Sequence, residues 1–201
     1  MKRHFLFLSS AEAQLSLGFG DARPLERLFF ALCPPPAVAD AAHAAAQSLR
    51  AQLPSARAVS RERLHVTLHY LGEYAGLPPA LLAGAQRAAQ SLRVAPFALA
   101  FDRIGSFGGQ RREHPLIALG EGAGIAGVTA LYRELAQALA REGIGRVAAF
   151  TPHLTLLYDR QGLTPQPLPA PLAWQVDSLS LLRSVRGEAL YREEGRWPLQ
   201  G

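Results

Sequence analysis

The chain has a single cysteine, a single lysine and no long apolar segment. Cys33 alone excludes an internal disulfide framework and a clustered-cysteine zinc site, and it fits a reducing compartment such as the cytoplasm. No stretch reaches the roughly 18 consecutive apolar residues of a transmembrane helix. The sequence also lacks an H-E-x-x-H zinc motif and a glycine-rich triphosphate loop. We therefore expect no membrane span, no metal and no cofactor.

Arginine is abundant in place of lysine. It supplies all but one of the 21 basic residues, and the net charge is +5. A positive field attracts phosphates and nucleic acids, so an anionic partner is favoured. Residues 1–24 carry a basic pair and an apolar run that is too short for a secretory signal, which predicts a flexible leader. Residues 25–201 have the length of a single bilobal domain, which we expect to be monomeric.

Short apolar or alternating runs predict strands, and longer alanine-rich runs without internal proline predict helices. The predicted strands are 27–32, 64–71, 97–104, 114–119, 152–157, 174–182 and 188–194, and the predicted helices are 37–53, 79–93 and 125–141. A proline-rich stretch, 164–171, predicts a linker before the last two strands.

The order strand, helix, strand occurs twice with an offset of 87 to 88 residues, which indicates an internal duplication. The predicted fold class is α+β, with two similar pseudo-twofold lobes, each a mostly antiparallel sheet with helices on one face. In this scheme strand 97–104 completes the first lobe and the last two strands complete the second. The cleft between the lobes is the expected site.

The duplicated segments each carry an H-x-T-L motif, His65-Val66-Thr67-Leu68 and His153-Leu154-Thr155-Leu156. Residues i and i+2 of a strand share a face, so each motif aims one imidazole and one hydroxyl in the same direction. Six histidines and five threonines in 201 residues give only about 0.15 chance H-x-T matches. Two matches in equivalent places therefore predict a functional pair of strands.

Paired histidines suit metal-free phosphodiester chemistry. With an ordinary pKa near 6.5, one imidazole accepts a proton from water while the other donates one to the leaving oxygen. The hydroxyls of Thr67 and Thr155 donate to the non-bridging oxygens, whose charge grows in the transition state. A strained cyclic phosphate is a suitable substrate, because the ring is already reactive. Hydrolysis then requires only that the attacking oxygen loses a proton and the leaving oxygen gains one.

Three segments of the chain resemble those of a known family. Residues 27–32 resemble its first strand, and residues 64–73 and 150–157 resemble its two active strands. Over residues 27–199 the chain is similar to the 2H phosphoesterase superfamily, specifically the bacterial RNA 2',3'-cyclic phosphodiesterases, also called the 2'-5' RNA ligase family. The resemblance implies hydrolysis of 2',3'-cyclic phosphate ends of RNA or nucleotides to 2'-phosphates, with weak reverse 2'-5' ligation.

The resemblance also implies roles for single residues. His153 would activate water and His65 would protonate the departing 3'-oxygen, although two symmetric imidazoles are equally compatible with the reverse. The family often has an aromatic residue near the base in its first strand, which makes Phe30, beside Phe29, a candidate substrate contact despite the simpler reading as core.

The chain departs from the family at one position. Tyr158 stands where many members have an arginine after the second motif. Tyr158 is a candidate for stacking on the substrate, although strand alternation puts it on the face opposite His153. The same alternation puts His69 on the face of His65, where it could extend the pocket.

Two other functions remain compatible with the sequence. One is a non-catalytic nucleotide- or RNA-binding module. The other is a related phosphodiesterase that acts on 2'-5' oligoadenylate or on another cyclic phosphate.

Overall fold

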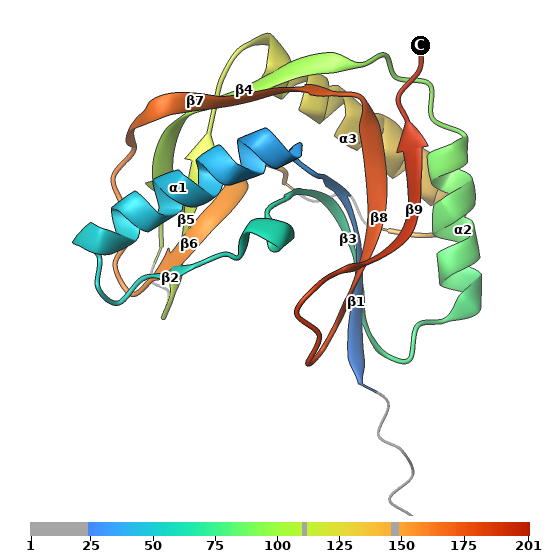
Figure 1. Ribbon diagram of the computed structural model, residues 1–201. Helices are drawn as coiled ribbons and strands as arrows, with labels where there is room; N and C mark the ends of the chain where they lie inside the picture. The colour runs from blue at the N-terminus through green and yellow to red at the C-terminus, as the bar shows by residue number, and fades with distance from the viewer. Residues whose placement is uncertain (1–23, 110–111, 146–148) are drawn as a thin grey trace, which may run out of the picture.

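The computed structural model describes residues 24–109, 112–145 and 149–201 (Figure 1). All but the last residue of the predicted leader, 1–24, lies outside the described residues. The elements follow in the order β1 (Leu25–Leu32), α1 (Pro36–Gln52), β2 (Arg57–Ala58), the 3₁₀ turn η1 (Arg61–Arg63), β3 (Val66–Ala75), α2 (Pro79–Gln90), β4 (Phe97–Ser106), β5 (His114–Leu119), α3 (Ala123–Arg141), β6 (Leu154–Asp159), β7 (Gln166–Val176), β8 (Ser178–Val185) and β9 (Arg192–Pro198).

The strands form two antiparallel sheets, which confirms the two-lobed α+β prediction. One sheet has four strands in the order β3-β1-β8-β9, and the other has five in the order β2-β6-β5-β4-β7. Helix α1 crosses one face of the five-stranded sheet and contacts β7, β2 and β6 (Figure 1). Helices α2 and α3 pack against each other, with α2 beside β9 and α3 against β4 and β3.

The predicted assignment of strands to lobes was wrong. β4 pairs with β5 and β7 in the five-stranded sheet, whereas β8 and β9 join β1 and β3 in the four-stranded one. The sheet of β1 and β3 is thus completed by β8 and β9 from the end of the chain, and the sheet of β5 and β6 includes β4 from the first half. β4 and β5 are consecutive strands that pair directly as antiparallel neighbours, the arrangement that short connections favour.

The predicted linker and the strand after it also differ from the structure. β7 already begins at Gln166 and ends at Val176, and the chain then passes to the other sheet, where β8 begins at Ser178. Proline is tolerated in β7 because this is an edge strand, whose outer amide groups have no ladder to complete. The predicted strand 174–182 is therefore two strands, and the last strand lies four residues later than predicted, at 192–198.

The helices begin where proline is compatible with a first turn. Pro36 and Pro79 occupy the first helical positions of α1 and α2, where no intrahelical amide bond is lost. The buried face of α1 is lined by alanines, which let the helix lie close to the sheet. Helix α3 instead buries Leu131 and Leu135, one turn apart, in the core between the lobes.

One main core runs through both lobes, and a second, small cluster lies apart from it. The main core contains Leu28 and Phe30 of β1. The small cluster contains Phe29, Ala31 and Leu182, with Tyr191 packed against it. Alternate residues of β1 thus belong to different clusters, because successive side chains of a strand point to opposite faces. The small cluster supports the wall of the site described next.

Candidate active site

The two H-x-T segments converge on one cavity. His65 immediately precedes β3 and His153 immediately precedes β6, and the Cα atoms of these two strands approach within 8 Å of each other although they belong to different sheets. Both imidazoles, together with Thr67 and Thr155, line a cavity of about 710 Å³. The structure therefore brings together the four residues that the motifs single out. We call this space the catalytic cavity, after the role that we propose for it below.

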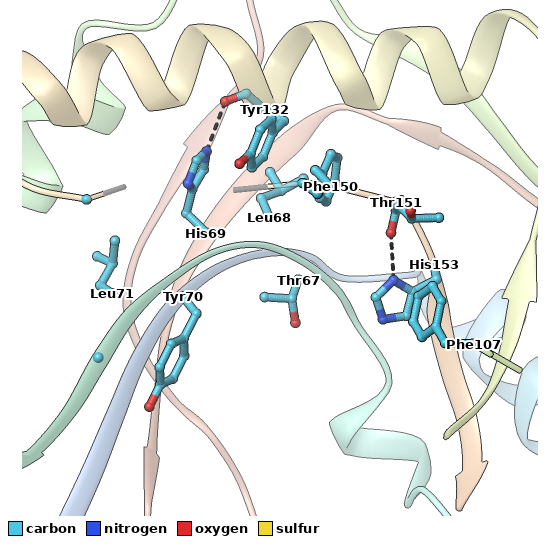
Figure 2. Close-up of a pocket in the computed structure, with 13 residues that line it drawn as sticks. Thr67, Leu68, His69, Tyr70, Leu71, Phe107, Tyr132, Phe150, Thr151 and His153 are labelled. Atoms are coloured by element: carbon cyan, nitrogen blue, oxygen red, sulfur yellow. Dashed lines mark hydrogen bonds between the residues drawn. The ribbon is translucent and has the colours of Figure 1, made fainter. Parts of the chain in front are cut away.

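The two imidazoles are held in the same way. His65 Nδ1 lies 2.7 Å from the carbonyl oxygen of Arg63, and His153 Nδ1 lies 2.7 Å from that of Thr151. A carbonyl oxygen only accepts, so each Nδ1 donates and carries a proton. Each Nε2 is then the atom that exchanges a proton with a ligand. In Figure 2 the free ring nitrogen of His153 points toward Thr67.

The threonine hydroxyls are available to a ligand. Among residues 24–109, 112–145 and 149–201, neither Thr67 nor Thr155 has a hydrogen-bond partner for its side chain. Both line the catalytic cavity. A half-exposed hydroxyl in such a place can donate to a phosphate oxygen without first giving up another bond.

A β-bulge follows the threonine in both strands. In β3, Thr67 pairs with Ala31 and His69 with Phe30, so Leu68 is an extra residue. In β6, the equivalent extra residue is Leu156. A bulge puts two successive side chains on one side of a strand, and the alternation after it is reversed. The two strands thus share this irregularity as well as the motif.

The bulges overturn the predicted faces of the residues that follow. Tyr158 lies on the same side as His153 and lines the catalytic cavity. His69 turns away from the face of His65. It is buried, its Nε2 lies 2.9 Å from the carbonyl oxygen of Tyr132, and its ring stacks on the Tyr132 ring at 4.2 Å. Figure 2 shows His69 pointing to α3, whereas Tyr70 and Thr67 point to the opposite side of β3.

Of the two phenylalanines of β1, only one reaches the site. Phe30 is 0% exposed in the main core and near Trp197, so the structure does not bring it to the cavity. Phe29 is packed against His65, with ring centroids 5.0 Å apart. Tyr191 meets His65 edge-on at 5.3 Å. Phe29 and Tyr191 together fix the imidazole plane from two directions.

Three arginines line the catalytic cavity, and sequence reasoning singled out none of them: Arg27, Arg57 and Arg63. The guanidinium of Arg57 lies over the ring of Tyr158, 5.0 Å from its centroid, because β2 pairs with β6 at these residues. Arg63 lies over the ring of Tyr191 at 4.3 Å and donates to Ser184 Oγ at 3.2 Å. The cluster of arginines just before the first motif was the signal that could have pointed to them.

Burial lowers the pKa of both catalytic candidates from the ordinary value of 6.5. Their hydrogen bonds to backbone carbonyls act in the opposite direction. The guanidinium of Arg63 and the imidazole of His153 further lower the pKa of His65. Desolvation and nearby cations both disfavour the charged imidazole, so the pair is mainly neutral at pH 7 in the free protein.

The described part of the chain contains no group of three or more His, Cys, Asp or Glu residues that could hold a metal ion. Within that same part, no helix is both long and apolar enough to cross a membrane.

The fold and the site define a two-lobed protein with one histidine and one threonine from each lobe in a shared basic cavity. The sequence profile of the 2'-5' RNA ligase superfamily matches residues 34–188. The chain belongs to this superfamily, which confirms the resemblance to the 2H phosphoesterases.

Solved structures agree with this assignment. The chain is similar to Escherichia coli LigT complexed with 3'-AMP, with 26% identity over 88% of this chain and 99% of that one, at a TM-score of 0.70. TT0787 of Thermus thermophilus is 25% identical over 87% and 98% of the two chains, also at 0.70. A crystal structure described as a phosphoesterase is 28% identical over 89% and 99%, at 0.66. No curated protein sequence matches the chain.

Proposed function

We propose that the protein hydrolyses 2',3'-cyclic phosphate ends of RNA or nucleotides to 2'-phosphates. The observation that carries this proposal is the shared cavity, in which His65 and His153 each donate from Nδ1 to a backbone carbonyl and keep Nε2 for the ligand. The family supports phosphoester chemistry, and the E. coli LigT structures with 3'-AMP and with ATP support a nucleotide ligand.

In the proposed reaction the cyclic phosphate lies between the two imidazoles. One neutral imidazole takes a proton from water, and the water oxygen forms a new bond to phosphorus. The bond from phosphorus to the 3'-oxygen breaks, and the other imidazole, protonated, gives its proton to that oxygen. The product is a 2'-phosphomonoester with a free 3'-hydroxyl, and the two imidazoles have exchanged protonation states.

The other residues of the cavity have supporting roles in this scheme. The hydroxyls of Thr67 and Thr155 donate to the non-bridging oxygens, and Arg57 and Arg63 supply positive charge around them. Tyr158 offers its ring to the nucleoside from beneath Arg57. A 5'-hydroxyl in place of water would form a 2'-5' linkage by the same proton transfers, which accounts for weak reverse ligation.

The test is the product of the wild-type protein on 2',3'-cyclic AMP and on an RNA with a cyclic end, in excess chelator, with phosphate position read by phosphorus NMR. Formation of the 2'-phosphate is expected. A 3'-phosphate product would contradict the proposed bond cleavage. Tight binding without turnover would instead identify a nucleotide-binding module. Absence of both would direct the search to 2'-5' oligoadenylate and other cyclic phosphates.

A further inference from the structure

A second cavity of about 780 Å³ adjoins the catalytic one, and the proposed reaction does not use it. We call it the β3-edge groove, because the consecutive residues 67–72 of β3 form one wall. Its lining outside β3 includes Phe107, beside His153, and Tyr132 and Phe150, near His69 (Figure 2). Thr67 and His153 line both cavities, so the groove opens directly onto the position proposed for the reacting phosphate.

The chemistry of the groove differs from that of the catalytic cavity. The catalytic cavity is lined by three arginines. The groove has no charged side chain among its lining residues in the described part of the chain, and it carries aromatic rings instead. Part of its lining is an aromatic stack, in which the ring of Tyr132 lies between those of His69 and Phe150 with centroid distances of 4.2 Å. Such a lining suits a flat, uncharged ring more than a phosphate.

Tyr70 is the exposed aromatic residue among those that line this groove in the described part of the chain. Its side chain is 57% exposed, one of two large apolar side chains that the described chain leaves open to solvent. It follows His65 by five residues, as Tyr158 follows His153, and the two bulges turn both tyrosines to the ligand side of their strands. The pseudo-twofold arrangement thus offers one tyrosine on each side of the proposed phosphate position.

The backbone of β3 adds polar groups to the side chains that line the groove. β3 is an edge strand of the four-stranded sheet, so its outer amide and carbonyl groups face the groove and no other strand of the described chain. An edge of this kind offers donors and acceptors in a fixed array. Ring faces with backbone hydrogen-bonding groups beside them are the features that single-stranded nucleic-acid sites use to hold a base.

From this arrangement we infer that the β3-edge groove binds the nucleobase of the nucleotide that precedes the cyclic end, with Tyr70 as its stacking residue. The inference rests on the proposed function and deepens it, since it makes the preferred substrate an oligonucleotide of at least two residues. A mononucleotide fills the catalytic cavity alone and leaves the groove empty.

The experiment compares kcat/KM for three substrates that share one cyclic end: 2',3'-cyclic AMP, the dinucleotide ApA with a 2',3'-cyclic phosphate, and the same dinucleotide with an abasic first sugar. The wild-type protein is expected to prefer the intact dinucleotide to the other two by about tenfold, within the range for one base stacked on an aromatic ring. Tyr70→Ala is expected to abolish this preference without changing kcat/KM for the mononucleotide. Tyr70→Phe is expected to keep it.

Leu190→Ala is the matched control, because Leu190 is 58% exposed and lines neither cavity. It is expected to leave all three values unchanged. An abasic dinucleotide as good as the intact one, or a loss in Tyr70→Ala that is equal for all substrates, would overturn the inference while leaving the proposed function standing. Failure of the wild-type protein on every substrate would overturn the proposed function, and the inference with it.

Discussion

The halves of the molecule around His65 and His153 share a local design but not an environment. Each has the H-x-T-L motif, a carbonyl two residues back that orients the imidazole, and a bulge after the threonine. His65, however, is enclosed by Phe29, Tyr191 and Arg63, whereas His153 meets the edge of Phe107 alone among the described rings. The two lobes thus offer imidazoles with the same local support, and the packing around them makes them unequal.

This inequality bears on which imidazole is protonated. Burial is the largest cause that lowers the pKa of both imidazoles, and the guanidinium of Arg63 lowers that of His65 further. A cation beside His65 opposes its protonation, which argues for His153 as the acid, the reverse of the assignment that the family resemblance implied.

Removal of either histidine gives the largest expected effect. His65→Ala and His153→Ala should each lower kcat for 2',3'-cyclic AMP by about 10² to 10⁴-fold, because each removes one positioned proton-transfer group. Rates in excess chelator, with circular dichroism to confirm folding, make the comparison. His43→Ala is the matched control, since His43 lies on α1 and its only hydrogen-bond contact among described side chains is Gln47. Normal turnover in either active-site variant would contradict the claim that both imidazoles transfer a proton.

The two phenylalanines of β1 should separate stability from activity. Phe30→Ala removes a fully buried ring from the main core and should lower the free energy of unfolding by about 3–5 kcal/mol. Phe29→Ala should cost less stability, since its cluster is small, but it should lower kcat by releasing the ring of His65. Urea unfolding and kcat are the two measurements. Equal stability losses with unchanged turnover in Phe29→Ala would contradict the role given to this ring.

A smaller effect is expected at Arg57, which lies in the same sheet as Thr155 because β2 pairs with β6. Arg57→Ala should raise KM for a cyclic nucleotide by about fivefold and leave kcat nearly unchanged, because it removes charge and the cover of the Tyr158 ring but no proton-transfer group. Arg87→Ala is the matched control: Arg87 is similarly exposed, at 60% against 65%, and pairs with Glu142 outside both cavities. A fall in kcat without a change in KM would count against ground-state binding by Arg57.

The sequence was sufficient to predict that His65 and His153 share one cavity. Two H-x-T-L copies, 88 residues apart where the strands before them are 87 apart, identify His65 and His153, because the alternation of side chains along a strand can be read from a short segment of sequence. The bulges could not be predicted in this way. Neither glycine nor proline marks Leu68 or Leu156, and only the pairing with the neighbouring strand reveals the extra residue. The predicted positions of His69 and Tyr158 failed for that reason.

Contacts between segments far apart in the sequence also could not be predicted from the local residue pattern. β4 was assigned to the first lobe because it follows that lobe in sequence, but the choice between two sheets depends on pairing energies across the whole fold. Arg57 and Arg63 reach the cavity from β2 and η1, far in sequence from the rings of Tyr158 and Tyr191 that they cover. Likewise, Phe29 and Phe30 have the same residue type and differ only in the face of β1 that they occupy.

The pH dependence of kcat/KM for 2',3'-cyclic AMP tests the central claim most directly, that two imidazoles in one cavity share the proton transfers. At low pH both are protonated and the base is lost, and at high pH both are neutral and the acid is lost, so a bell-shaped profile is expected. Because burial lowers the pKa of both, its two limbs should lie on the acid side of 6.5. A profile with a single limb, or one whose limbs shift when chelator is added, would contradict the paired-histidine account.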